Sequence, residues 1–374
     1  MTRSLAYERE NALNAICPYF TMFPLEYPLR VLESHKHDSP VVMDPFCGRG
    51  TTLFAARKLG LVGRGLDSSP IAVAIARAKL AFVDPVAVLK RAKLFIDQHV
   101  SPSMPETEFF QHAFTPRVLR QICAIRDGLM AVRRESNTTV VLRAAMLGCL
   151  HGPLTKAPES GSYFSNQMPR TFAAKPDYSV RFWRQKEMLA PEVDVIDVLR
   201  RKLERIAQDQ LPAVGASASV RHADSRLAHS LSAGTRDFSV VVTSPPYYGM
   251  RTYVQDQWLR NWFLGGPDHV DYNNEFQLEH TGTDVFAKSL GQVWKNMART
   301  HADKLDMYIR FGIIPSSKVD AKAVLRASLE ESRESWREVS VRAADTASSG
   351  KRQADHMAAS SLAATEYDFH IKKT

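Results

Sequence analysis

Four residues that follow a strand-like segment have the chemistry to hold an amino group. The apolar run before Ser244 is β-branched, as in a buried strand, and it stops at Ser244, Pro245, Pro246 and Tyr247. Prolines lack a backbone N–H, so the carbonyls of Ser244 and Pro245 face no competing donor, and the Ser244 hydroxyl adds an acceptor. Tyr247 follows with a flat ring. These four residues form a candidate catalytic site for a planar group that carries an NH₂; a turn with packing aromatics is the alternative.

Upstream, a glycine turn joins a second strand-like segment to a helix. Its residues are Asp44, Pro45, Phe46, Cys47, Gly48, Arg49, Gly50, Thr51 and Thr52. The glycines let a ligand approach the backbone closely, and either threonine can cap the helix. Asp67 ends the next strand-like segment about 20 residues after the turn, where a carboxylate can bind ribose hydroxyls. Because Asp44 would repel a pyrophosphate, the pattern favours a cationic nucleoside such as S-adenosylmethionine.

Composition and charge bound the class of protein. The 374 residues carry a formal net charge of +9, which favours a polyanionic partner. The four cysteines show no CxxC spacing, so neither a zinc site nor a disulfide framework is indicated, and we expect no metal. The N-terminus lacks a signal-peptide apolar block, and no apolar run is long enough to cross a bilayer. We therefore expect a cytoplasmic protein without membrane contact.

Between residues 84 and 213 the pattern changes from strands and helices to helices and loops. Helical periodicity covers 86–99, 116–134, 138–150 and 193–208, and we expect a loop-rich stretch over 151–188. Basic and aromatic side chains alternate in that stretch, a composition suited to phosphates and bases. The candidate nucleic-acid-binding residues are Arg170, Lys175, Arg181, Arg184 and Lys186. A solvated loop docked by its aromatic residues is the alternative.

Taken together, the two motifs resemble those of S-adenosylmethionine-dependent DNA methyltransferases that modify exocyclic amino groups. The matching pieces are the glycine turn with Asp67, then Asp224, then the Ser-Pro-Pro-Tyr element, and 19–32 is similar to the segment that this family places first. The resemblance implies an α/β, Rossmann-like class I methyltransferase fold with a mostly parallel seven-stranded sheet and a helical insertion. We expect a catalytic domain of 1–83 and 214–374, and a target-recognition region over 84–213.

The resemblance also implies roles for individual residues. In this family the residue matching Asp67 holds the ribose, the one matching Asp224 contacts adenine, and the turn surrounds the methionine part of the cofactor. The implied cofactor-binding residues are Tyr19, Phe20, Asp44, Pro45, Phe46, Cys47, Gly48, Gly50, Thr51, Thr52, Asp67, Ser68, Asp224 and Ser225. A serine in the position of Ser244 goes mainly with cytosine N4 in this family, and Asp or Asn with adenine N6.

The sequence thus predicts methyl transfer from S-adenosylmethionine to cytosine N4 in double-stranded DNA, as in restriction–modification or phage defence. Adenine N6 methylation, an RNA amino-methyltransferase and a non-catalytic nucleic-acid-binding protein are the alternatives. Carbon-5 methylation needs a cysteine nucleophile, typically after proline, and the chain has only the reverse order, Cys17-Pro18. A cognate restriction endonuclease is a candidate partner, and the chain is expected to be a monomer or homodimer.

Overall fold

A computed structural model gives the fold. It describes residues 13–19, 24–154, 161–169, 175–208, 217–231, 235–249, 254–272, 278, 281–313, 319–344 and 366–374. The chain divides into two compact units. The sheet unit comprises the described parts of 19–76, 214–252 and 275–374, and the helical unit those of 1–18, 77–213 and 253–274.

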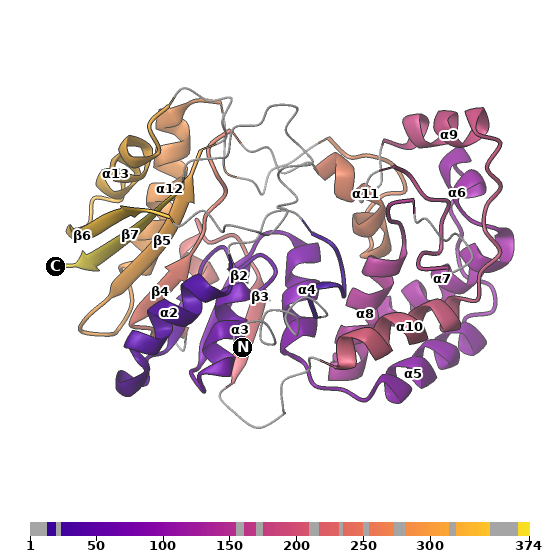
Figure 1. Cartoon of the computed structure of the whole chain (residues 1–374), viewed down its shortest axis with the longest axis horizontal. Helices are drawn as coiled ribbons and strands as arrows, with labels where there is room; N and C mark the ends of the chain where they lie inside the picture. Colours follow the sequence, from indigo (N-terminus) through magenta and orange to yellow (C-terminus); the bar gives the residue numbers. More distant parts are fainter. Residues whose placement is uncertain are drawn as a thin grey trace, which may run out of the picture. The chain divides into compact units, whose positions relative to one another are not determined.

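The described residues of the sheet unit build a seven-stranded sheet (Figure 1). Its strands are β1 (Val42–Asp44), β2 (Gly63–Asp67), β3 (Ala218–His222), β4 (Val240–Thr243), β5 (Asp306–Gly312), β6 (Trp336–Ala343) and β7 (Glu366–Lys373). They lie in the order β3-β2-β1-β4-β5-β7-β6. The pairs from β3 to β5 are parallel, whereas β7 is antiparallel to both β5 and β6.

This arrangement is consistent with the class I methyltransferase fold expected from the sequence. The sheet is mixed rather than wholly parallel, because β7 returns between β5 and β6 in the opposite direction. The parallel strands β1, β2 and β4 end at one edge, where ligands bind in open α/β sheets. The glycine turn and the Ser-Pro-Pro-Tyr element both leave the sheet at that carboxyl edge.

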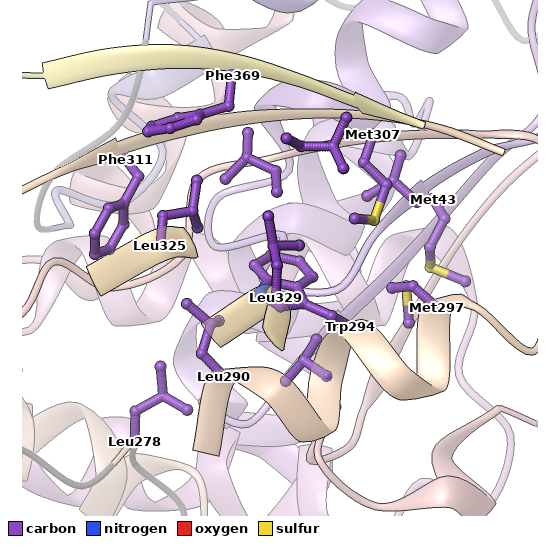
Figure 2. Packing of buried hydrophobic residues seen from close by; sticks show 14 of the residues in the cluster. Met43, Leu278, Leu290, Trp294, Met297, Met307, Phe311, Leu325, Leu329 and Phe369 are labelled. Atoms are coloured by element: carbon purple, nitrogen blue, oxygen red, sulfur yellow. The ribbon is translucent and has the colours of Figure 1, made fainter. Parts of the chain in front are cut away.

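Helices cover the sheet with apolar side chains. They are α2 (Glu26–Ser34), α3 (Thr51–Lys58), α4 (Pro70–Leu80), α12 (Thr283–Met297) and α13 (Ala321–Glu331), and the boundary between the units falls within α4. Figure 2 shows Phe311 of β5 and Phe369 of β7 together with Leu325 of α13 and Leu290 and Trp294 of α12. Their burial fixes the strands whose ends carry the candidate site.

The helical unit contains α5 (Pro85–Gln98), α6 (Glu108–Ala113), α7 (Pro116–Met130), α8 (Asn137–Cys149), α9 (Pro176–Gln185), α10 (Val195–Ala207) and α11 (Val254–Phe263). The sequence analysis assigned α11 to the catalytic segment 214–374. In the structure it packs within the helical unit, because Trp258 meets Phe109 at 4.6 Å and Trp262 meets Phe110 at 4.6 Å between ring centroids.

The expectation of a loop-rich 151–188 was wrong for its last part, which forms helix α9. Pro176 occupies the first turn, where its missing N–H costs nothing. Val180 and Trp183 are buried, and the Trp183 indole donates to the Gln167 carbonyl at 3.0 Å. The basic residues of this segment favoured a nucleic-acid-binding loop, although its apolar residues have helical spacing. Within the described part of the chain, no helix is long and apolar enough to span a membrane.

The close packing of α12 on α13 yields a stability prediction. A Cβ added at Gly291 would lie 2.9 Å from the Ser328 carbonyl oxygen, which belongs to the backbone and cannot rotate away. Gly291→Ala should therefore lower the free energy of unfolding by about 1–3 kcal/mol, although alanine normally favours a helix interior. Urea unfolding measures this, and Lys288→Ala on the exposed face of α12 is the control. Equal or greater stability of the Gly291→Ala protein would contradict the packing described.

Candidate active site at the carboxyl edge of the sheet

Strands β1 and β4 bring the two sequence motifs together. They are parallel neighbours, with Val42 opposite Val240 and Met43 opposite Val241. Beyond this register, the Thr243 hydroxyl donates to Asp44 Oδ1 at 2.6 Å. The glycine turn therefore begins beside the last residue of β4, and Ser244 is the next residue. The two motifs leave adjacent strand ends on the same edge.

The glycine turn is built around backbone conformations that need glycine. Gly48 and Gly50 have φ of 49° and 76°, in the left-handed region that other residues rarely adopt. A Cβ at Gly50 would also lie 3.0 Å from the Ala76 Cβ. The turn continues into α3, and the Thr52 hydroxyl donates to the Val242 carbonyl at 3.0 Å. Thr52 is fully buried and holds α3 to β4, so its hydroxyl is committed to the fold.

Asp67 lies at the end of β2 with both carboxylate oxygens hydrogen-bonded to backbone. Oδ2 accepts from Gly48 N at 2.8 Å, and Oδ1 accepts from Ser69 N at 2.8 Å. Burial raises the pKa of Asp67, while these two N–H groups act in the opposite direction. Each carboxylate oxygen retains acceptor capacity, and the side chain is half-buried rather than sealed. Such a carboxylate can accept hydrogen bonds from the hydroxyl groups of a ribose.

Asp44 is the most costly charge at this edge. Its side chain is fully buried, and burial raises its pKa to about 6 despite the hydrogen bond from Thr243. Oδ1 also accepts from Phe46 N at 3.1 Å. Among the described residues, Oδ2 has no hydrogen-bond partner. A buried carboxylate with an orphaned oxygen suits a cationic ligand, which supplies the missing interaction.

The remaining predicted cofactor residues divide into those near the turn and those committed to packing. Tyr19 is buried, and its hydroxyl donates to Ser69 Oγ at 3.1 Å, which places it beside the Asp67 loop. Phe46 packs against Trp294 with ring centroids 6.5 Å apart. Cys47 and Thr51 are buried within the turn. Pro45 and Ser68 lie in the loops after β1 and β2, and Phe20 lies outside the described residues.

Asp224 follows β3 at the same edge, but its carboxylate already has a strong partner. Arg226 donates from Nε to Oδ1 at 3.0 Å and from Nη2 to Oδ2 at 2.6 Å, and its backbone N–H also donates to Oδ1 at 2.9 Å. Ser225 is buried, and its carbonyl accepts from Asn296 at 2.9 Å. The predicted adenine contact by Asp224 therefore has to coexist with Arg226, which sequence analysis did not single out.

The Ser-Pro-Pro-Tyr element is anchored on its Tyr247 side. Tyr247 is half-buried, with its ring 6.2 Å from Phe311 in an edge-to-face contact. Burial, followed by the negative charge of Glu366, raises the pKa of Tyr247 far above that of free tyrosine, and Ser244 and Arg310 act in the opposite direction. Tyr248, by contrast, bridges to Ile313 and packs on Phe286. Tyr247 is the aromatic residue tied to the candidate site.

Three further residues shape this edge, and no sequence pattern pointed to them. Ser69 donates to Asp67 through its backbone N–H, Arg226 neutralises Asp224, and the charge of Glu366 on the last strand raises the pKa of Tyr247. None lies in a motif, although Ser69 and Arg226 each follow a candidate residue within two positions. Within the described parts of the chain, no cluster of three or more His, Cys, Asp or Glu side chains is placed to hold a metal ion.

The predicted nucleic-acid-binding residues lie on and beside α9 in the helical unit. Lys175, Arg181 and Lys186 are exposed. Arg184 is also exposed but forms an ion pair with Glu108. Arg170 lies outside the described residues. The structure therefore groups three candidates on and beside one short helix, and among the described residues none of their side chains forms an ion pair or hydrogen bond.

Comparison with known proteins gives two sequence matches, each to part of the chain. Residues 2–77 match the model of a family described as DNA methylase. A 90-residue stretch is 32% identical to the Type II methyltransferase M.MjaII of Methanocaldococcus jannaschii, covering 24% of this chain and 16% of that protein. The chain thus matches only a small part of its curated relative. The family-model match contains the glycine turn and Asp67.

Two solved structures of the rRNA methyltransferase aviRa from Streptomyces viridochromogenes also align. One has a TM-score of 0.32 and 14% identity over 95% of this chain and 87% of that one. The other has a TM-score of 0.33 and 13% identity over 96% and 91%. These scores are too low to carry an argument about function.

The burial of Asp44 predicts a pH-dependent stability. Its pKa of about 6 exceeds the ordinary value of 3.8, so the stability given by the protonated form is full below about pH 4 and is lost as the pH rises through about 6. Asp44→Asn should keep the bond from Thr243 and raise the free energy of unfolding by roughly 1–2 kcal/mol above pH 6. Urea unfolding across this pH range, with the exposed Asp38→Asn as control, measures the effect. A variant less stable than the parent at every pH would contradict this assignment.

Proposed function

We propose that this chain is an S-adenosylmethionine-dependent DNA methyltransferase that acts on an exocyclic amino group. The family-model match to 2–77 and the partial likeness to a Type II methyltransferase support this class of enzyme. The observation that carries the proposal is the bond between Thr243 and Asp44, at 2.6 Å. This hydrogen bond joins β4, which leads into the Ser-Pro-Pro-Tyr element, to β1, which leads into the glycine turn.

The residues present fit the cofactor. Asp67 would bind the ribose hydroxyls, the backbone around Gly48 and Gly50 would lie against the methionine part, and the orphaned Asp44 Oδ2 would face positive charge. Once bound, S-adenosylmethionine supplies an electrophilic methyl group on a sulfonium. Asp224 would reach the adenine only together with Arg226, which already binds both of its oxygens.

The Ser244 and Pro245 acceptors would act on the target amino group. The amino nitrogen of a nucleobase is a poor nucleophile, because its lone pair is delocalised into the ring. Acceptors on both N–H groups favour a pyramidal nitrogen and free the lone pair, and much of the rate comes from positioning. Tyr247 would stack on the base once it has left the duplex.

Cytosine N4 is the favoured target because the first residue of the element is Ser244. Adenine N6 is the alternative within the same reaction class, and an RNA amino group is the alternative substrate. A restriction–modification or phage-defence setting and a partner endonuclease remain proposals that rest on the family resemblance. The helical unit is proposed to recognise the target, with exposed basic residues of α9 contacting phosphates.

The catalytic proposal predicts a separation of methyl transfer from cofactor binding. Ser244→Ala and Tyr247→Ala should each lower transfer of labelled methyl to duplex DNA by at least about 100-fold. The first removes an acceptor for the amino group, and the second removes the ring that would stack on the base. Calorimetric affinity for S-adenosylmethionine should change little. Asp67→Ala should instead weaken cofactor binding. Nucleoside analysis of the product distinguishes N4-methylcytosine from N6-methyladenine, and tRNA is the competing substrate. A Tyr247→Ala protein that methylates at the parent rate would refute the mechanism.

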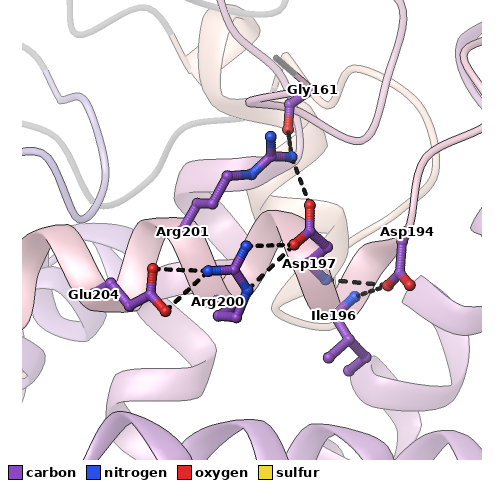
Figure 3. Close-up of polar contacts among 7 residues, drawn as sticks. All are labelled: Gly161, Asp194, Ile196, Asp197, Arg200, Arg201 and Glu204. Atoms are coloured by element: carbon purple, nitrogen blue, oxygen red, sulfur yellow. Dashed lines mark hydrogen bonds and ion pairs between the residues drawn. The ribbon is translucent and has the colours of Figure 1, made fainter. Parts of the chain in front are cut away.

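The basic residues of α9 predict a salt-dependent contribution to DNA affinity. Lys175→Gln, Arg181→Gln and Lys186→Gln together should reduce the slope of log affinity against log salt by about 0.9 for each phosphate that they no longer neutralise. The control is Arg200→Gln on α10, because Arg200 donates to Glu204 at 2.9 Å and to Asp197 at 2.6 Å and is already neutralised (Figure 3). Fluorescence anisotropy measures the slopes. If the slope of log affinity against log salt were equal for the triple variant and the parent, the basic residues of α9 would not contact DNA.

A further inference from the structure

Helix α9 is anchored in the helical unit by its apolar face. Val180 and Trp183 are buried on that face, and the centroid of the Trp183 ring lies 5.4 Å from that of Phe109 on α6. At the start of the helix, the backbone N–H of Tyr178 donates to the Lys175 carbonyl at 3.0 Å. These contacts fix the orientation of α9, and with it the positions from which the side chains of the opposite face project.

The opposite face of α9 presents an aromatic ring between two cations. Residues three or four positions apart lie on the same side of a helix. The side opposite Val180 is formed by Lys175 at the N-cap, Tyr178, Arg181 and Gln185. All four are exposed, and Tyr178 is 52% exposed. Among the described residues, the side chains of Lys175 and Arg181 form no ion pair or hydrogen bond, so both charges are available to an anionic partner.

The structure separates Tyr178 from the other aromatic residues that the sequence placed among basic ones. Within the described residues of 151–188, the other aromatic side chains pack into the helical unit fully or in part, and they are Tyr163, Phe164, Phe182 and Trp183. An exposed ring adds little to the hydrophobic stability of a fold. Tyr178 is therefore the ring of this group that can contact a partner without any rearrangement of the packing.

We propose that Tyr178 stacks on a DNA base that has lost its place in the double helix, while Lys175 and Arg181 neutralise neighbouring phosphates. The inference rests on the function proposed above and deepens it, because it gives the helical unit a contact to a base. Every base has a π-face, so an aromatic ring can stack on any of the four. Methyl transfer to a base amino group requires that a base leaves the duplex, which disrupts pairing and stacking there. Bases in an intact duplex already stack on one another and offer such a ring little.

The test compares the affinities for two duplexes, one fully paired and one that carries a single unpaired base in a bulge. Tyr178→Ala should weaken binding to the bulged duplex by about 5- to 100-fold, the effect of removing one stacking ring. Its affinity for the paired duplex should be nearly unchanged. Because the ring is uncharged, the slope of log affinity against log salt should stay as in the parent. Tyr178→Phe keeps the ring and should bind both duplexes as the parent does. Fluorescence anisotropy measures these affinities.

Tyr272→Ala is the matched control. Tyr272 is 65% exposed in the same unit, but Asp268 and Asp271 rather than cations precede it in the sequence, so both affinities should stay as in the parent. The inference would be overturned if Tyr178→Ala lost no affinity or lost it equally on both duplexes, if it changed the salt slope, or if Tyr178→Phe bound as weakly.

Failure of the proposed function gives different results. A parent protein that binds neither duplex would refute DNA as the substrate. A parent protein that binds DNA but transfers no methyl group to it would refute the proposed catalysis, and the affinities of the Tyr178 variants would still test the stacking.

Discussion

The pairing of β1 with β4 is the constraint on which the rest of the candidate site depends. The bond from Thr243 to Asp44 joins residues 199 positions apart in the sequence. Because the two strands are parallel, whatever follows each of them emerges at the same edge of the sheet. A second bond, from Thr52 to the Val242 carbonyl, ties the helix after the glycine turn to β4. The glycine turn and the Ser-Pro-Pro-Tyr element are therefore rigidly related through the sheet.

Electrostatics at this edge favour a positively charged ligand. Burial raises the pKa values of both the fully buried Asp44 and the half-buried Asp67, so the fold carries the cost of desolvating two carboxylates to different extents. Asp67 offsets part of this cost with two backbone N–H groups, whereas one oxygen of Asp44 has no partner among the described residues. Asp224 is instead neutralised within the protein by Arg226. A cation at the turn would relieve the charge that the protein leaves unbalanced.

Local sequence patterns predicted the strands and the turn well, since these depend on neighbouring residues. The positive φ at Gly48 and Gly50 and the buried run of β4 follow from residue type. Long-range pairing could not be predicted in the same way. Nothing near Glu366 in the sequence indicates that its strand would insert between β5 and β6. Helix α9 was not predicted either, because its basic residues suggested a loop although two of its apolar side chains are buried. The roles of the cofactor residues remain predictions.

The most direct test of the central claim is a crystal structure with sinefungin, a cofactor analogue that carries an amine in place of the transferable methyl group. We expect the ribose to bind Asp67 and the amine to lie near Asp44, within roughly 6 Å of Ser244 Oγ. That distance is the sum of one hydrogen bond and one near-attack separation. An analogue bound elsewhere, or bound at the turn with its amine directed away from Ser244, would contradict the account.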